Sequence, residues 1–258
     1  MNSRKNQLQL LDKLLSIIDE LRAKCPWDKK QTFETLRPLT IEETHELSDA
    51  IVENDYDEIK SELGDLLLHI IFYSKIASEE EKFDIGDVSK TICDKLIYRH
   101  PHIYGSAKVK DEKEVKRNWE SLKLKKDNTS VFSGVPSSIP EIIKSTRIQD
   151  KAAGVGFEWN NLEDVWSKVK EEESEFIEAV KGGKRSSMED EFGDLIFSLI
   201  NYARFIKIDP ELSLKKTNKK FIDRFQHMEK SAKLKNISIE SLSLSDLKKL
   251  WKKAKKIR

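Results

Sequence analysis

Two short acidic motifs contain the residues best placed to carry out chemistry. Glu171-Glu172-Glu-Ser-Glu175 is followed by Glu191-Phe-Gly-Asp194, and helical residues three or four apart project from one face. If the two segments form an antiparallel hairpin, their carboxylates lie at one height. Facing carboxylates resist ionisation unless a cation or a basic side chain lies among them. An oxygen-only cluster suits Mg²⁺ or Mn²⁺, which often act beside substrate phosphates, so the motifs indicate phosphoanhydride chemistry.

The same pattern occurs 129 residues earlier, as Glu42-Glu43-Thr-His-Glu46 and Glu62-Leu-Gly-Asp65. A single acidic pair is most often a solvated helix face or half of an ion pair. Because the acids recur in two copies beside long apolar runs, we favour metal binding over that interpretation. The candidate ligands are Glu172, Glu175, Glu191 and Asp194, with a candidate second site at Glu43, Glu46, Glu62 and Asp65.

A di-iron bundle is the alternative metal site, because Glu42-Glu43-Thr-His45 contains one Glu-x-x-His motif. The repeat argues against it. His45 and His69 are replaced by Ser174 and Ser198 in the second copy, whereas every carboxylate is retained. We therefore expect coordination by oxygen alone.

Basic residues near the second copy have the spacing expected of a phosphate clamp. Lys168 precedes Glu171 and Glu172 by three and four residues, and Lys220 shares a helix face with Arg224. Trp251 and Lys255 lie four apart near the end of the chain, where the tryptophan either stacks on a base or packs in a core. Each basic residue alone would suit a surface ion pair, but together they predict a clamp for phosphates.

Composition limits the classes of partner and compartment. Charged residues form 36% of the chain yet cancel to a net +1, so we expect no electrostatic binding of DNA or RNA. The two cysteines indicate neither a disulfide framework nor a zinc site. No apolar run is long enough for a membrane span, and no signal peptide is evident, so we expect a soluble cytoplasmic protein.

Apolar residues at spacings of three and four predict an all-α fold of two tandem homologous helical bundles. The repeat and a turn-rich stretch predict an N-terminal domain at 1–127, a linker at 128–140 and a C-terminal domain at 141–258. The predicted helices cover Lys5–Ala23, Ile41–Val52, Asp57–Ala77, Gly86–Arg99, Lys113–Lys125, Pro140–Ala152, Leu162–Lys181, Ser187–Lys207, Pro210–Lys233 and Ser243–Lys255.

With Glu-Glu-x-x-Glu and Glu-x-x-Asp on a helical hairpin, twice, the chain resembles the two-domain MazG-type nucleoside triphosphate pyrophosphohydrolases. The resemblance covers nearly the whole length and includes Cys25-Pro-Trp-Asp28, Phe33-Glu-Thr-Leu36, Arg99-His-Pro-His102, Val155-Gly-Phe-Glu-Trp159, Asn218-Lys-Lys-Phe221 and Arg224-Phe225.

The resemblance implies a Mg²⁺-dependent homodimer that hydrolyses nucleoside triphosphates to monophosphate and pyrophosphate. Carried over by motif, Glu172, Glu175, Glu191 and Asp194 would hold the metal, and Glu171 would help position the metal or the attacking water. The residues expected to face the nucleotide are Lys168, Asn218, Lys220, Arg224, Trp251 and Lys255. A protein that senses nucleotides or metal without turnover is the alternative.

The resemblance places hydrolysis in the C-terminal domain, and the residues around the acids agree with it. The repeat pairs Lys168 with Leu39, and aligning Lys220 with Lys95 pairs Asn218 with Cys93. The first copy thus lacks two members of the clamp. We expect the second domain to catalyse, and the first to bind weakly, regulate or serve assembly.

Overall fold

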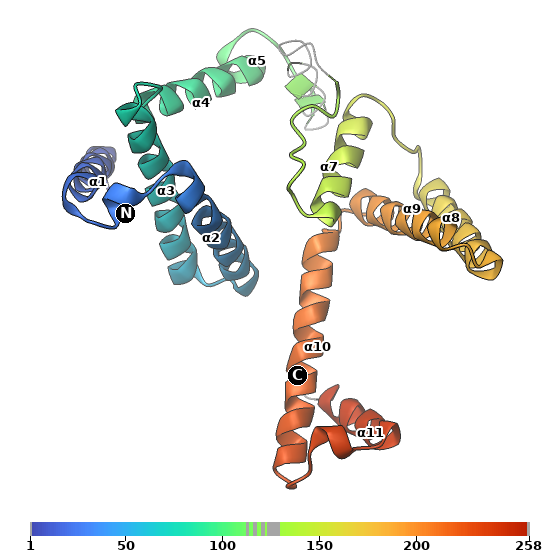
Figure 1. The fold of residues 1–258 in the computed structure, drawn as a ribbon. Helices are drawn as coiled ribbons and strands as arrows, with labels where there is room; N and C mark the ends of the chain where they lie inside the picture. The colour runs from blue at the N-terminus through green and yellow to red at the C-terminus, as the bar shows by residue number, and fades with distance from the viewer. Residues whose placement is uncertain (1, 112–113, 116–117, 120–121, 123–129, 257–258) are drawn as a thin grey trace. The chain divides into compact units, whose positions relative to one another are not determined.

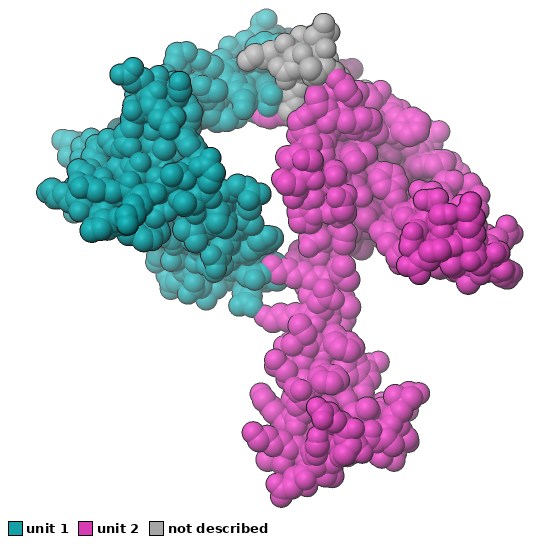
Figure 2. Space-filling view, viewed as in Figure 1, with its two compact units in different colours: residues 1–108 teal, residues 109–258 magenta. Residues whose placement is uncertain are grey.

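The structure is a computed structural model that describes residues 2–111, 114–115, 118–119, 122 and 130–256 (Figure 1). Every regular element in these ranges is a helix, so the predicted all-α fold is confirmed. The chain forms two compact units, residues 1–108 and 109–258 (Figure 2). No helix of the described residues is both long and apolar enough to cross a membrane.

Unit 1 is built around a helical hairpin. The helices of this unit are α1 (Arg4–Lys24), α2 (Phe33–Glu53), α3 (Tyr56–Glu79), α4 (Ile85–Arg99) and the short α5 (Pro101–Tyr104), with a 3₁₀ turn η1 (Asp28–Lys30). Helix α2 packs along α3, and α1 covers the other side of α3. Asn54, which adopts a left-handed conformation with φ 57°, ends α2, and the Asp55 side chain caps α3 one residue later.

Helix α2 starts eight residues earlier than the predicted Ile41, because the local signals at Thr32 outweigh the proline. The Thr32 hydroxyl accepts a hydrogen bond from the Thr35 backbone, and the Thr35 hydroxyl accepts one from the Thr32 backbone. Leu36 is then buried in the core. Pro38 lies in the second turn, where it removes one backbone hydrogen bond but does not end the helix.

The core of unit 1 lies where α1 and α2 meet α3. Ile18 of α1 and Leu36 of α2 are each 1% exposed and pack with apolar side chains of α3. Burying side chains of this size stabilises the unit by roughly 1.5 to 3 kcal/mol each. This packing fixes the register of the hairpin that carries the first acidic motif. The core residues of α3 are Ile71, Phe72 and Ile76.

Unit 2 contains the second hairpin. Its helices are α7 (Glu141–Gly154), α8 (Leu162–Gly182), α9 (Arg185–Phe205), α10 (Pro210–Lys233) and α11 (Leu244–Ala254), with a 3₁₀ turn η2 (Ile239–Ser241). Helices α8 and α9 lie side by side, joined by a turn in which Gly183 has φ 72°. A glycine suits this left-handed position because it has no Cβ atom to strain. The next helix begins at Arg185, two residues before the predicted start, and without a side-chain cap.

The last two helices extend away from the second hairpin. Helix α10 has the predicted bounds, and it contacts α7 and α9 while also packing against α11. In Figure 1, α10 runs away from α8 and α9, and α11 lies beside its C-terminal half. The acids of α8 and α9 and the basic residues of α10 and α11 therefore occupy different parts of unit 2.

Two predictions fall partly outside the described residues. The helix expected at Lys113–Lys125 includes 112–113, 116–117, 120–121 and 123–125, and the linker expected at 128–140 begins at 128–129, none of which the structure describes. The domain division at 128–140 stays a prediction. The boundary between the two compact units falls between residues 108 and 109 of the chain.

Candidate functional site

The second hairpin brings three of its four predicted ligands together. One carboxylate oxygen each of Glu172 and Glu175 on α8 and Glu191 on α9 lie within 4.8 Å of one another. Glu172 is buried, Glu191 is half-buried and Glu175 is exposed. Asp194, one turn after Glu191, is exposed and does not belong to this group of three. A cation bound here would therefore meet one buried and two more accessible carboxylates.

Lys168 supplies the second hairpin with a positive charge of its own. Its Nζ atom lies 2.6 Å from Oε1 of Glu171 and 2.8 Å from Oε1 of Glu172. The hydrogen bonds to Glu171 and then to Glu172 raise the pKa of Lys168 above its ordinary value. The predicted spacing of three and four residues therefore corresponds to direct contacts, and Lys168 remains charged at neutral pH.

The neighbouring acids affect the pKa of Glu175 even though Lys168 is nearby. Burial raises the pKa of Glu175, followed by its hydrogen bond with Glu172 and the charges of Glu172 and Glu191, while Lys168 partly opposes these effects. A cation bound among these carboxylates would reduce their mutual repulsion.

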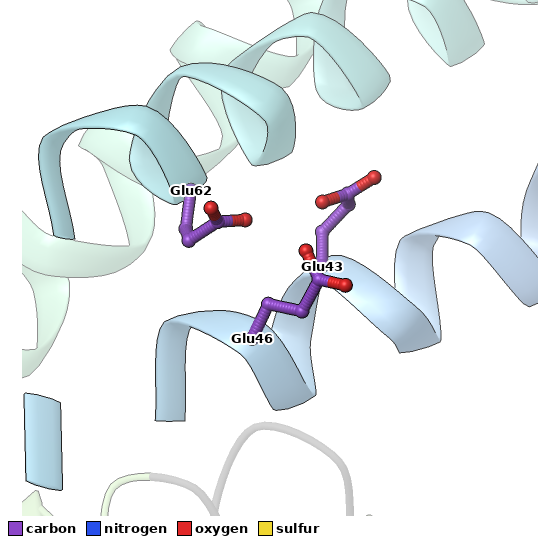
Figure 3. A group of neighbouring side chains, drawn as sticks. All are labelled: Glu43, Glu46 and Glu62. Atoms are coloured by element: carbon purple, nitrogen blue, oxygen red, sulfur yellow. The ribbon is translucent and has the colours of Figure 1, made fainter. Parts of the chain in front are cut away.

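The first hairpin forms a group of the same kind (Figure 3). Glu43 and Glu46 on α2 and Glu62 on α3 each place one carboxylate oxygen within 4.8 Å of the others. Glu62 is 7% exposed, and its Oε2 atom is buried without a hydrogen-bond partner. Within the described part of the chain, no lysine, arginine or histidine forms an ion pair with any of the three. Asp65 is half-buried and lies outside the group of three, as Asp194 does in the second copy.

The pKa values in the first hairpin show the consequence. Burial is the leading cause that raises the pKa of Glu43, Glu46 and Glu62. The second largest cause is in each case an acidic neighbour. The charge of Asp65 raises the pKa of Glu43, and the charge of Glu62 raises that of Glu46. The hydrogen bond with Glu43 raises the pKa of Glu62. Leu39, which stands at the repeat position of Lys168, packs against the apolar core instead of meeting the acids.

The donor atoms of both groups fit a hard divalent cation. All six carboxylates offer oxygen, and the unpartnered Oε2 atom of Glu62 is the kind of buried polar atom that needs a partner. The described residues place no cysteine in either group, and no histidine belongs to them. The oxygen-only choice made from the sequence therefore suits Mg²⁺ or Mn²⁺ better than a metal that prefers nitrogen or sulfur.

The other predicted nucleotide-binding residues form a separate group on α10 and α11. The Arg224 guanidinium lies 5.9 Å from the centre of the Trp251 ring, within cation–π range. Asn218, Lys220 and Lys255 are exposed. Within one chain the structure thus brings Lys168 alone of the six to the acids, and the convergence of the whole set stays a prediction.

One contact in the α10–α11 group has no role in the sequence-based prediction. Phe221 lies 5.0 Å from Trp251 between ring centres in a tilted arrangement, so the tryptophan contacts an aromatic ring as well as Arg224. The spacing Phe221-x-x-Arg224 is the signal that could have found it, because it puts both side chains on one helix face.

Comparison with known proteins finds two matching segments, and each of them includes one of the two acidic hairpins. The family model described as the MazG nucleotide pyrophosphohydrolase domain matches residues 31–104, which include the first hairpin, and 161–229, which include the second. The chain is 40% identical over 251 residues to the nucleoside triphosphate pyrophosphohydrolase/pyrophosphatase MazG of Thermotoga maritima, with 95% of this chain and 96% of that protein covered.

Two further relatives extend the comparison. A nucleoside triphosphate pyrophosphohydrolase of Escherichia coli (strain K12) is 36% identical over 255 residues, which cover 95% of this chain and 97% of that protein. The protein YabN of Bacillus subtilis is 44% identical over 246 residues, which cover 93% of this chain and 50% of YabN. With two family segments, each centred on one acidic hairpin, the chain belongs to the MazG nucleotide pyrophosphohydrolase family.

Proposed function

We propose that this chain is an enzyme that hydrolyses nucleoside triphosphates, ribo or deoxy, to the monophosphate and pyrophosphate in the presence of Mg²⁺, with Mn²⁺ as a substitute. One observation carries the proposal: the acidic group of the second hairpin adjoins a charged lysine, and this arrangement would suit a cation with a phosphate beside it. Two relatives that align over almost their whole length bear the name of this activity. Removal of unwanted nucleotides from the cellular pool is the role that we infer.

Each residue of the second hairpin has a chemical task in this proposal. Glu172, Glu175 and Glu191, with Asp194 from the next turn, would hold the ion, which supplies charge neutralisation for the leaving pyrophosphate. Lys168 would exchange its ion pairs with Glu171 and Glu172 for the oxygens of the phosphate chain. Glu171, released from the lysine, would then orient the attacking water or accept its proton.

The residues of α10 and α11 would hold the nucleotide at a distance from the metal. Trp251, flanked by Phe221 and Arg224, offers an aromatic face on which a base can stack. Asn218, Lys220 and Lys255 are exposed and able to reach phosphate or sugar oxygens. Their roles come from the family resemblance, and they depend on how α10 and α11 meet the hairpin when substrate is bound.

We further propose that the protein works as a homodimer in which the hairpins provide the contact faces. At matching repeat positions, Leu63 and Phe192 are 52% and 50% exposed, and Ile70 and Leu199 are 48% and 44% exposed. Exposed apolar side chains at the same place in both copies are typical of surfaces that another protein covers. Light scattering should give twice the 30.0 kDa mass of the chain, and Leu63→Lys combined with Phe192→Lys should give the single mass.

Identification of products tests the catalytic proposal directly. The purified chain should convert a panel of canonical and modified nucleoside triphosphates to monophosphate and pyrophosphate in equal amounts, and EDTA should stop the reaction. Chromatography would separate these products from diphosphate and phosphate, whose appearance would contradict the cleavage position. Nucleotide binding without any product would support the alternative, a protein that senses nucleotide or metal. The first domain, whose copy of the clamp lacks a lysine and an asparagine, is the part of the chain for which this alternative has support.

A further inference from the structure

The first acidic group contains a buried carboxylate that forms no ion pair with a basic residue in the described part of the chain. Glu62 is 93% buried, its carboxylate lies on the side of α3 that faces Glu43 and Glu46 (Figure 3), and its Oε2 atom has no hydrogen-bond partner. Glu43, which hydrogen-bonds with Glu62, and Glu46 face it from α2, so its neighbours in the group are acidic and none of them supplies a positive charge. A buried carboxylate of this kind is costly unless a cation or a donor meets it.

The second acidic group differs in this respect. Its buried member, Glu172, accepts a hydrogen bond from Lys168 at 2.8 Å, and the same lysine contacts Glu171 at 2.6 Å. A divalent cation that enters this group must work against the nearby ammonium group or displace it. The repeat position of Lys168 in the first copy is Leu39, whose partly buried side chain packs against the apolar core.

We propose that the first acidic group, Glu43, Glu46 and Glu62, binds one divalent cation in the absence of nucleotide, whereas the second group binds its cation weakly until phosphate draws Lys168 away. The affinity of oxygen sites for hard cations rises with the negative charge of the ligands. Both groups offer three carboxylates, but only the second carries a neutralising lysine. The first domain would thus hold a resident ion, and the second would acquire its ion together with substrate.

The cation site of the first domain and the movement of Lys168 in the second domain rest on different observations. The nucleotide-free site in the first domain follows from the buried Glu62 and needs no assumption about catalysis. The transfer of Lys168 to phosphate rests on the proposed function. A chain that hydrolyses no nucleotide could therefore still show the first site, and an active enzyme could still lack it.

Titration with Mn²⁺ tests the nucleotide-free site without an activity assay. The full-length protein, stripped with EDTA and dialysed at pH 7.5, is titrated with MnCl₂ while electron paramagnetic resonance reports free Mn²⁺. We expect one tight site per chain. Glu62→Gln, which keeps the shape of the side chain and removes its charge, should weaken that site at least about tenfold, or about 1.4 kcal/mol. Glu191→Gln, the same change at the matching repeat position, should leave it intact.

A second variant tests why the copies differ. Lys168→Leu gives the second group the residue that the first copy has, and it should strengthen nucleotide-free binding there at least about tenfold, so that two tight sites appear per chain. Circular dichroism would check that each variant is folded. The inference is overturned if the wild-type chain has no tight site without nucleotide, if Glu191→Gln removes that site while Glu62→Gln keeps it, or if Lys168→Leu leaves the second group unchanged.

Discussion

The two hairpins place the same three carboxylates in the same arrangement, yet they differ in what surrounds those carboxylates. In each copy two glutamates of one helix meet one glutamate of the next within 4.8 Å. The buried glutamate of the second copy is paired with Lys168, whereas buried Glu62 of the first copy has an oxygen without a partner. Duplication has therefore kept the acids and changed their neighbours, so the neighbours must decide what each site does.

The supports of the hairpins are also similar in kind. Lys75 at the end of the first hairpin forms an ion pair with Asp19 of α1 at 2.8 Å. Arg204, at the matching repeat position, contacts Glu158 at 2.6 Å and Asp150 of α7 at 3.7 Å. A basic residue thus ties the second helix of each hairpin to the segment that precedes the hairpin. The functional contrast does not come from a different scaffold.

The largest expected effect compares Glu172 with Glu43, which occupy matching repeat positions. Glu172→Gln removes a ligand charge from the proposed catalytic site, and we expect kcat/KM for a nucleoside triphosphate to fall at least about 100-fold, or about 2.7 kcal/mol. Glu43→Gln removes the matching charge from a copy that lacks the lysine, and we expect a change below about threefold. Release of pyrophosphate by folded protein is the measurement.

The reverse pattern would assign catalysis to the first domain. Normal turnover by Glu172→Gln with loss in Glu43→Gln would show that the first copy acts without a lysine at position 39. Equal losses would instead show that both hairpins contribute to one rate. Either result would sink the division of labour that Lys168 indicates.

A smaller effect isolates the lysine. Lys168→Ala should raise KM about tenfold, or about 1.4 kcal/mol of lost phosphate binding, with a lesser effect on kcat. The control is Lys170→Ala, an exposed lysine two residues away that projects from another face of α8. Steady-state kinetics of the two variants would separate a phosphate contact from a general loss of positive charge. A normal KM in Lys168→Ala would mean that the lysine serves only as a partner of the acids.

Local patterns predicted most of the elements and part of the site. Helix α10 has the bounds expected from the sequence, and α8 ends at Gly182, one residue after the predicted Lys181. The contacts of Lys168 follow from spacings of three and four on one helix. These features depend on residues within one or two turns, where spacing is enough to determine which side chains meet.

Features that depend on tertiary packing cannot be predicted from the spacing of residues in the sequence. The sequence treats Asp65 and Asp194 as equal members of their groups, but in the structure both lie outside the close set of three. Nothing in the spacing of Glu62 distinguishes it from Glu191, although only Glu62 is buried without a partner for one oxygen. Helix α2 begins eight residues before the predicted Ile41, because Thr32 and Thr35 form a capping box at its start.

The smallest expected effect is a dependence of stability on pH that comes from Glu62 of the first hairpin. Burial, and next the hydrogen bond with Glu43, raise the pKa of Glu62 above its ordinary value of 4.5. A carboxyl whose pKa is higher in the folded than in the unfolded state keeps its proton longer when folded. Its contribution to stability is therefore full below the unfolded pKa and is lost as the pH rises from there through the folded pKa.

In EDTA, Glu62→Gln should therefore melt a few degrees above the wild-type chain at pH 7, and this advantage should shrink toward pH 4, because Glu62 of the wild-type chain then carries its proton. Glu191→Gln is the control, and its melting temperature should follow the wild-type curve more closely. Addition of Mn²⁺ at pH 7 should reverse the order, because an ion that binds the native state stabilises the wild-type chain and not the variant. Melting curves at several pH values, with and without Mn²⁺, measure both effects. If Glu62→Gln stays the more stable protein in saturating Mn²⁺, then the charge of Glu62 is an uncompensated cost, and the contrast between the hairpins concerns stability and not metal binding.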